Sequence, residues 1–446
     1  MADRSPHLTR RTVLGTGAAT AAAALTLGSL PSAQAAKGPS TRNITFRAWR
    51  GAQLGGGTSN GTAVTGGVLG IAAVTGSRSY SDVRTGATAT YDTATWTSPV
   101  VDPGHAFTEL VASWNATTPD GSWVEVRVRA VADDGTAGWY VLGRWASDDV
   151  DDGGAINRTS LNGQATSYAT VYTDTLAALN DHTLRTWQLE VTLLRRAGTA
   201  TSPSVRLVAA MASGLPGDKK VPVSALGPAS AAAVDLGVPT YSQEVHKGHY
   251  PAYDNGGEAW CSPTSTAMVV GFWGAGPSAA DTAWVTPPLD AAVDHAARNV
   301  YDYTYDGCGN WPFNTAYAAA YGLEGFVTRL RSLAEAERFV AAGIPLVASV
   351  SFKKGELKGA GYGTNGHLLV IRGFTASGDV VVNDPASHLI ADDAQVRVVY
   401  DREQFENVWV PHSGGIVYVI HPARRCRPLG GSGPGELVGR IGGLWP

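Results

Sequence analysis

Alternation of apolar and polar residues is the feature that most constrains how the first half of this chain can fold. In the segment 122–132, valine or alanine occupies positions 124, 126, 128 and 130, and charged residues separate them. A β-strand places successive side chains on opposite faces, so this pattern predicts a strand with one buried face. Asp133-Asp134-Gly135 predicts a turn, and 138–145 has the pattern of the returning strand. The rhythm recurs in several segments between 43 and 212, which predicts an antiparallel β-sandwich domain there.

Residues 213–235 differ from both flanking regions because they are rich in Pro, Ala, Gly and Ser. Such a composition predicts a linker between two domains. After it, three helical patterns between 263 and 343 precede strand patterns in the remainder of the chain. Helices followed by an antiparallel sheet predict an α+β domain over residues 236–422, and a Gly/Pro-rich tail follows at 423–446.

The N-terminus has the three parts of an export signal. Arg10 and Arg11 form a charged region, an apolar run of small residues follows, and Ala33-Gln34-Ala35 matches a small-x-small cleavage site. Residues 1–35 are therefore predicted to be a signal peptide, and the mature protein is expected to be secreted, extracellular or associated with the cell wall. The paired arginines favour the twin-arginine route; an ordinary secretory signal that contains two arginines is the alternative.

Composition excludes several function classes. The formal net charge of −4 offers no basic face for nucleic acid or anionic lipid. No apolar run after the signal reaches the length of a membrane-spanning helix, so no membrane insertion is expected. Aromatic residues of the first domain could stack on sugars, which makes a glycan contact one expectation, although most of them are expected in the sandwich core.

Cys261 is one of only three cysteines, and it stands where a helical pattern begins. Pro263 suits the first helical turn, because its missing N–H has no partner there in any case. The N-terminus of a helix stabilises a thiolate, which is the nucleophilic form of cysteine. From this segment alone, a nucleophile and a structural cysteine (a disulfide half or a buried thiol) are equally compatible with the pattern.

A nucleophilic cysteine needs a base, and the base needs an orienting group. His367 opens a strand pattern, a turn is expected at 375–378, and Asp384 ends the returning strand. Because the separation of His367 and Asp384 is odd, a turn of even length places both side chains on one face. A carboxylate beside an imidazole fixes its tautomer and stabilises the imidazolium. The alternatives are a solvent-exposed histidine at a strand end and an ordinary Asn-Asp-Pro turn.

Taken in order, four segments resemble the papain-like cysteine peptidases related to the bacteriocin-processing, double-glycine leader peptidases: VPTYSQ (238–243), CSPTSTAMVVGFWG (261–274), AAGIPLVASVSF (341–352) and NGHLLVIRGFTASGDVVVNDPA (365–386). The resemblance covers only the second domain. It implies that Cys261 is the nucleophile, His367 the general base and Asp384 the orienting acid. It also matches Gln243 to the glutamine that helps the backbone N–H of the nucleophile bind the oxyanion.

The sequence therefore predicts an exported cysteine peptidase that acts on peptide substrates and needs no metal or organic cofactor. Ser262 stands where the family has glycine, a departure that removes no catalytic group. Leader processing is not expected, because those enzymes act as cytoplasmic domains of transporters. Two alternatives remain: an amidase or endopeptidase that cuts cell-wall peptides, and a binding protein whose peptidase fold is inactive.

Three weaker patterns concern cysteine pairing and metal ions. Cys308 and Cys426 either form one disulfide or both stay reduced. His246 and His249 could suggest zinc, but no CxxC or HExxH accompanies them, and a loop beside the substrate cleft explains them as well. The acidic run 147–154 lacks the spacing of a calcium loop and is predicted to be a surface turn.

Overall fold

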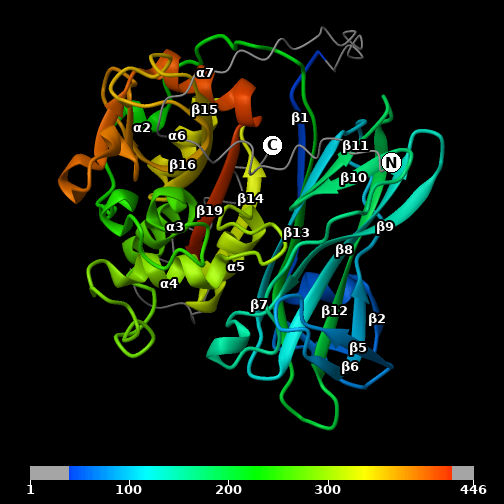
Figure 1. Cartoon of the computed structure of the whole chain (residues 1–446). Coiled ribbons are helices and arrows are strands. Elements are labelled where there is room, and N and C mark those ends of the chain that lie inside the picture. The colour runs from blue at the N-terminus through cyan, green and yellow to red at the C-terminus, as the bar shows by residue number, and fades with distance from the viewer. Residues whose placement is uncertain (1–39, 424–446) are drawn as a thin grey trace, which may run out of the picture.

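The structure, a computed structural model, describes residues 40–423, which form two domains side by side (Figure 1). The predicted export signal at 1–35, all but the first residue of the tail at 423–446, and Cys426 lie outside the described residues. Among the described residues, no helix combines the length and the apolar character needed to cross a bilayer.

Two antiparallel sheets form the first domain, as the alternating pattern predicts. The first sheet runs in the order β10-β11-β7-β13-β4-β3, with β1 also paired to β13. Its strands are β1 (Asn43–Arg50), β3 (Thr62–Thr65), β4 (Val68–Ile71), β7 (Glu109–Thr117), β10 (Ala169–Tyr172), β11 (Thr175–Ala178) and β13 (Ser204–Gly214). The second sheet contains β2 (Thr58–Asn60), β5 (Gly76–Ser81), β6 (Thr88–Thr97), β8 (Ser122–Ala132), β9 (Ala137–Trp145) and β12 (Leu184–Arg196).

The predicted inward face of β8 is fully buried, and most tryptophans of this domain lie in its core. The outward face is not simply solvated. Glu125 on β8 is buried and accepts from Arg78 on β5 and Arg144 on β9, so ion pairs between strands of this sheet cover this face.

The second domain is α+β, as predicted, and its six-stranded antiparallel sheet runs in the order β14-β19-β15-β16-β17-β18. Its strands are β14 (Leu323–Arg329), β15 (Leu346–Phe352), β16 (Thr364–Phe374), β17 (Val380–Asn383), β18 (Arg397–Tyr400) and β19 (Ile416–Pro422). Its helices are α2 (Pro228–Ala231), α3 (Cys261–Phe272), α4 (Ala291–Val300), α5 (Trp311–Ala320), α6 (Leu333–Ala341) and α7 (Arg402–Ser413). The sequence patterns did not indicate β14, β18, α4 or α7.

The two domains share one hydrophobic core. Phe313 of α5 packs against Trp114 of β7 and Trp145 of β9, with ring centroids 6.1 and 5.4 Å apart. The segment 213–235, predicted as a linker, also packs against the second domain, because the buried Arg402 donates to backbone oxygens of this segment. The two domains lie side by side (Figure 1), and apolar side chains of both belong to one buried cluster.

Polar side chains complete this interface. Asn115 of β7 is buried and binds both backbone groups of Gly325 on β14, donating to its oxygen at 2.8 Å and accepting from its nitrogen at 3.2 Å. The acidic run 147–154 also belongs to the interface. Asp149 in it is fully buried and accepts two hydrogen bonds from Arg298 of α4, at 2.9 and 2.8 Å, so the expectation of a surface turn is wrong at this residue.

The Asn115 contact predicts how strongly the domains are coupled. Asn115→Ala leaves the N–H and C=O of Gly325 buried without partners, and we expect it to lower the free energy of unfolding by about 2–4 kcal/mol. Urea denaturation of both proteins measures the difference. The control is Thr117→Ala at the exposed end of β7, with an expected change within about 0.5 kcal/mol. Equal losses in the two variants would contradict the assignment.

Candidate active site

The β16–β17 hairpin brings His367 and Asp384 together. Nε2 of His367 lies 2.8 Å from Oδ1 of Asp384, and both side chains are buried. The sequence pattern predicted a turn of even length at 375–378. In the structure five residues, 375–379, separate the paired Phe374 and Val380, so the turn is odd. An odd loop alone would direct the two side chains to opposite faces of the sheet.

A β-bulge in β16 compensates for the odd length of the turn. The register of β16 against β17 shifts between Ile371 and Gly373, so Arg372 is an extra residue on β16. The side chain of Arg372 holds this bulge by donating to Asp235 at 2.7 Å and to the backbone oxygen of Val238 at 3.1 Å. His367 and Asp384 share a face because of this irregularity.

Cys261 is the first residue of α3, where the N–H groups of the first turn have no partner within the helix. The helix is buried on nearly all sides, and Ser265 donates to the backbone oxygen of Leu368 at 3.1 Å. That bond ties α3 to β16 next to His367. Ser262, which replaces the family's glycine, is buried and forms a 2.9 Å hydrogen bond with the hydroxyl of Tyr418 on β19.

The three side chains form one electrostatic unit. Burial lowers the pKa of His367, but the Asp384 carboxylate and a hydrogen bond to Cys261 outweigh it and raise the pKa to about 10. Burial alone would raise the pKa of Asp384, but His367 and the hydroxyls of two tyrosines lower it below its usual range. Because Nε2 of His367 is bound to Asp384, the other ring nitrogen is the one left for the thiol.

Tyr362 and Tyr400 complete the surroundings of Asp384, and sequence reasoning missed both. Tyr400 donates to Oδ2 at 2.7 Å, and Tyr362 lies within 3.0 Å of both oxygens. The backbone N–H of Ala386 adds a further bond of 3.0 Å. Neither tyrosine lies in a segment with a sequence signature, so only the folded chain reveals them.

Gln243 lies on the 3-10 turn η3 (Gln243–His246) and is buried. Its side-chain nitrogen donates to the backbone oxygen of Glu258 at 2.7 Å, in the turn η4 (Gly257–Ala259) that leads into Cys261. Gln243 does not line the cleft that Cys261 and His367 line. The structure therefore places Gln243 against the segment before the thiol.

The cleft has a volume of about 490 Å³ and lies between the domains. Cys261, His367 and Trp311 line it from the second domain, and Thr108 and Glu109 line it from the first. Glu109 forms an ion pair with Arg329 across the domain boundary, beside the cleft. The first domain therefore forms part of the wall of the candidate site.

The remaining candidate residues lie away from this cleft. Cys308 is a free thiol in the structure, fully buried, and burial raises its pKa well above the usual range. His246 and His249 lie together with Asp294 of α4, a residue that the sequence patterns did not connect to them.

A cysteine at a helix start, beside a histidine and a carboxylate on a hairpin, places the second domain in the class of cysteine-peptidase folds. Residues 235–416 match the Peptidase C39 like family, and residues 45–213 match the Peptidase C39 N-terminal domain. The second domain therefore belongs to the peptidase C39-like family, and a C39 N-terminal domain precedes it. The family implies a peptide substrate.

The other comparisons add little. A search of curated proteins finds no match. One similar solved structure is that of infectious bursal disease virus Gt strain, with 15% identity, a TM-score of 0.18, and coverage of 42% of this chain and 37% of that chain. Another is a family two carbohydrate esterase from Cellvibrio japonicus, with 10% identity, a TM-score of 0.15, and coverage of 43% of this chain and 42% of that chain. The matches span less than half of each solved chain, and at these TM-scores they carry no argument.

The pKa of His367 gives a prediction that needs no substrate. In the wild-type protein we expect the ring to stay protonated through neutral pH and to lose its proton near pH 10. In Asp384→Asn the attraction of the carboxylate is lost, so the ring should titrate at a pH lower by about 1–3. NMR titration of ¹³C-labelled histidine measures both values, with the partly exposed His105, which lies outside the site, as the control. A His367 signal that titrates near pH 6.5 in both proteins would contradict the ion-pair assignment.

Proposed function

We propose that this protein is an exported cysteine peptidase in which Cys261, His367 and Asp384 form the catalytic triad. The observation that carries the proposal is His367, which lies 2.8 Å from Asp384 and lines the same cleft as Cys261. Export rests on the N-terminal sequence pattern, with the signal peptide at 1–35.

In the proposed mechanism the Cys261 sulfur, as thiolate, attacks the carbonyl carbon of the scissile bond. His367 gives its proton to the leaving amine as the C–N bond breaks and a thioester forms. Water then attacks the thioester and His367 takes a proton from it. The C–S bond breaks, which releases the carboxylic acid product and restores the Cys261 thiolate beside the protonated His367. Asp384 holds the ring in place and stabilises its charged form.

The developing oxyanion would be bound by the backbone N–H of Cys261 and by the side-chain amide of Gln243. The helix start supplies the first donor, because the N–H of Cys261 has no partner within α3. The second donor would be the side-chain amide of Gln243. One of its N–H groups is bonded to the backbone oxygen of Glu258, so the other N–H would have to reach the substrate.

The substrate is a peptide, and the cleft fits an extended segment lying between the domains. Charges of both signs, from Glu109, Arg329 and Arg42, lie along the cleft and would select polar side chains of the substrate. A cell-wall peptide is one such substrate for an exported enzyme. A glycan contact by the first domain would use Trp139 and Tyr172, its large aromatic residues that are exposed in the described part of the chain.

Selective alkylation tests the nucleophile. Mild iodoacetamide treatment should label Cys261 and leave Cys308 unlabelled, because Cys308 is fully buried and its pKa is raised. In His367→Ala the rate of labelling at neutral pH should fall by at least tenfold, since the imidazolium that stabilises the thiolate is gone. Peptide mapping by mass spectrometry reads out both sites. Equal labelling of the two cysteines would overturn the assignment.

Cleavage profiling tests the activity itself. The secreted protein is incubated with a peptide library and with purified cell wall, and new termini are identified by mass spectrometry. Cys261→Ala is the control and should produce none, while His367→Ala should lower turnover by orders of magnitude. Cleavage confined to cell-wall peptides would favour the amidase or endopeptidase alternative. Absence of cleavage in both pools, with Cys261 still selectively alkylated, would favour the inactive binding protein.

The oxyanion role of Gln243 has its own test. Gln243→Ala should lower kcat by about 10²–10³ with little change in KM, because the amide acts on charge that develops only in the transition state. Gln243→Glu should be worse, because a carboxylate would face both the oxyanion and the backbone oxygen of Glu258. Steady-state kinetics on the best peptide gives both constants. An unchanged kcat in Gln243→Ala would remove Gln243 from the mechanism.

A further inference from the structure

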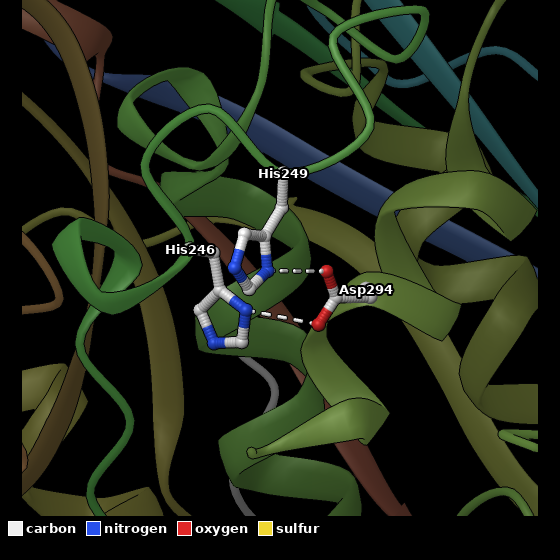
Figure 2. Close-up of side chains that lie close together, drawn as sticks. All are labelled: His246, His249 and Asp294. Atoms are coloured by element: carbon white, nitrogen blue, oxygen red, sulfur yellow. Dashed lines mark hydrogen bonds and ion pairs between the residues drawn. The ribbon is translucent and has the colours of Figure 1, made fainter. Parts of the chain in front are cut away.

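His246, His249 and Asp294 form a cluster of possible metal ligands outside the catalytic cleft. His246 lies on η3, His249 on the loop that follows, and Asp294 on α4. Figure 2 shows the two imidazole rings beside one carboxylate, each with a nitrogen near a different oxygen of Asp294. Residues from two separate segments of the chain therefore converge on one point.

The distances suit two ligands of one small cation. Nδ1 of His246 lies 2.9 Å from Oδ2 of Asp294, and Nδ1 of His249 lies 3.1 Å from Oδ1. Ligand atoms at about 2.0–2.1 Å from a tetrahedral Zn²⁺ are roughly 3.3 Å apart. Each of these two pairs would therefore need to open by only a few tenths of an ångström to share the ion, and all three ligand atoms lie within 4.8 Å of one another.

Polar atoms in this cluster lack the hydrogen bonds that burial demands. His246 and Asp294 are completely buried, and neither ring nitrogen of His246 nor Oδ2 of Asp294 has a hydrogen-bond partner among the described residues. The 2.9 Å contact between Nδ1 and Oδ2 is too poorly aligned to count as one. Such atoms cost free energy unless something binds them. A cation that lies off the line between the two atoms would bind both.

The local charge also favours a cation. The carboxylate of Asp290, at the start of α4, lies close enough to His246 to interact with it electrostatically, in addition to Asp294. Imidazole binds a metal ion in its neutral form, so the negative charge among the three ligands would come from the Asp294 carboxylate. A divalent ion would compensate that charge.

We propose that His246, His249 and Asp294 bind one divalent transition-metal ion, with Zn²⁺ as the best match. Two imidazole nitrogens and one carboxylate oxygen form a common set of ligands for this ion. A fourth position would remain for water on the side of His249, which is the partly exposed member of the cluster. The ion would pin η3, which carries Gln243, to α4.

The second group of this kind provides a matched control. Asp133, Asp134 and His182 also bring their ligand atoms within 4.8 Å of one another, but all three are wholly or partly exposed. His182 already forms an ion pair of 2.8 Å with Asp133. Neither buried nor short of partners, this group is not expected to hold an ion.

The experiment uses the mature chain with Cys261→Ala, so that neither the reactive thiol nor peptidase activity influences the result. After treatment with a chelator, titration with Zn²⁺ in a calorimeter should give one equivalent bound. His249→Gln should weaken binding at least tenfold, and His182→Ala should leave it unchanged. At a Zn²⁺ concentration 100 times Kd, Tm should rise by a few degrees in the parent and the His182→Ala variant only.

Cobalt gives a readout that a purely structural role of His249 would not produce. Co²⁺ in the site should show the intense visible absorption of a four-coordinate ion, and His249→Gln should lose it while keeping the circular dichroism spectrum of the parent. Failure of the parent to bind Zn²⁺ or Co²⁺ at micromolar concentration would overturn the proposal. Binding that survives His249→Gln and disappears in His182→Ala would also overturn it, by moving the ion to the other group.

Discussion

The buried charge of Asp384 is the constraint on which the candidate site depends. A carboxylate taken out of water is costly unless its oxygens are bonded and its charge is paired. His367 supplies the charge, and Tyr362, Tyr400 and the N–H of Ala386 supply the further bonds. These donors come from different parts of the second domain, so the ion pair forms only when the sheet and the loop around it are complete.

The first domain is also joined to the second by buried groups that satisfy one another's hydrogen bonds. Its sheet shares a hydrophobic core with α5, and the pairing of Asn115 with Gly325 satisfies backbone groups that would otherwise face an apolar surface. Glu109 of this sheet lies beside the cleft and pairs with Arg329. In the proposed peptidase both domains would contact the substrate, because Thr108 and Glu109 of the first domain line the same cleft as Cys261.

Local sequence predicts what local physics controls. The alternation in β8 and the start of α3 at Cys261 follow from residue spacing, and the fold classes of both domains followed from such patterns. His367 and Asp384 share a face as predicted, but through an odd turn and a bulge at Arg372, not through the even turn expected from the sequence. That bulge is held by Asp235, more than 100 residues earlier in the chain, and no local pattern reports such a contact. The prediction of a surface turn is wrong at Asp149 for the same reason, since its partner Arg298 lies in the other domain.

The turn η3 links the two proposals physically. Gln243 and His246 are its first and last residues, and they hold opposite sides of it, one bonded to the oxygen of Glu258 and the other facing Asp294. Gly257, at the start of η4, packs so closely on His246 that a methyl group there would lie 2.3 Å from its backbone oxygen. The segment that leads into Cys261 therefore rests directly on η3. An ion bound to His246 would act on the thiol only through position, by fixing the turn from which the Gln243 amide reaches the oxyanion, and it would take no part in the proton transfers of His367.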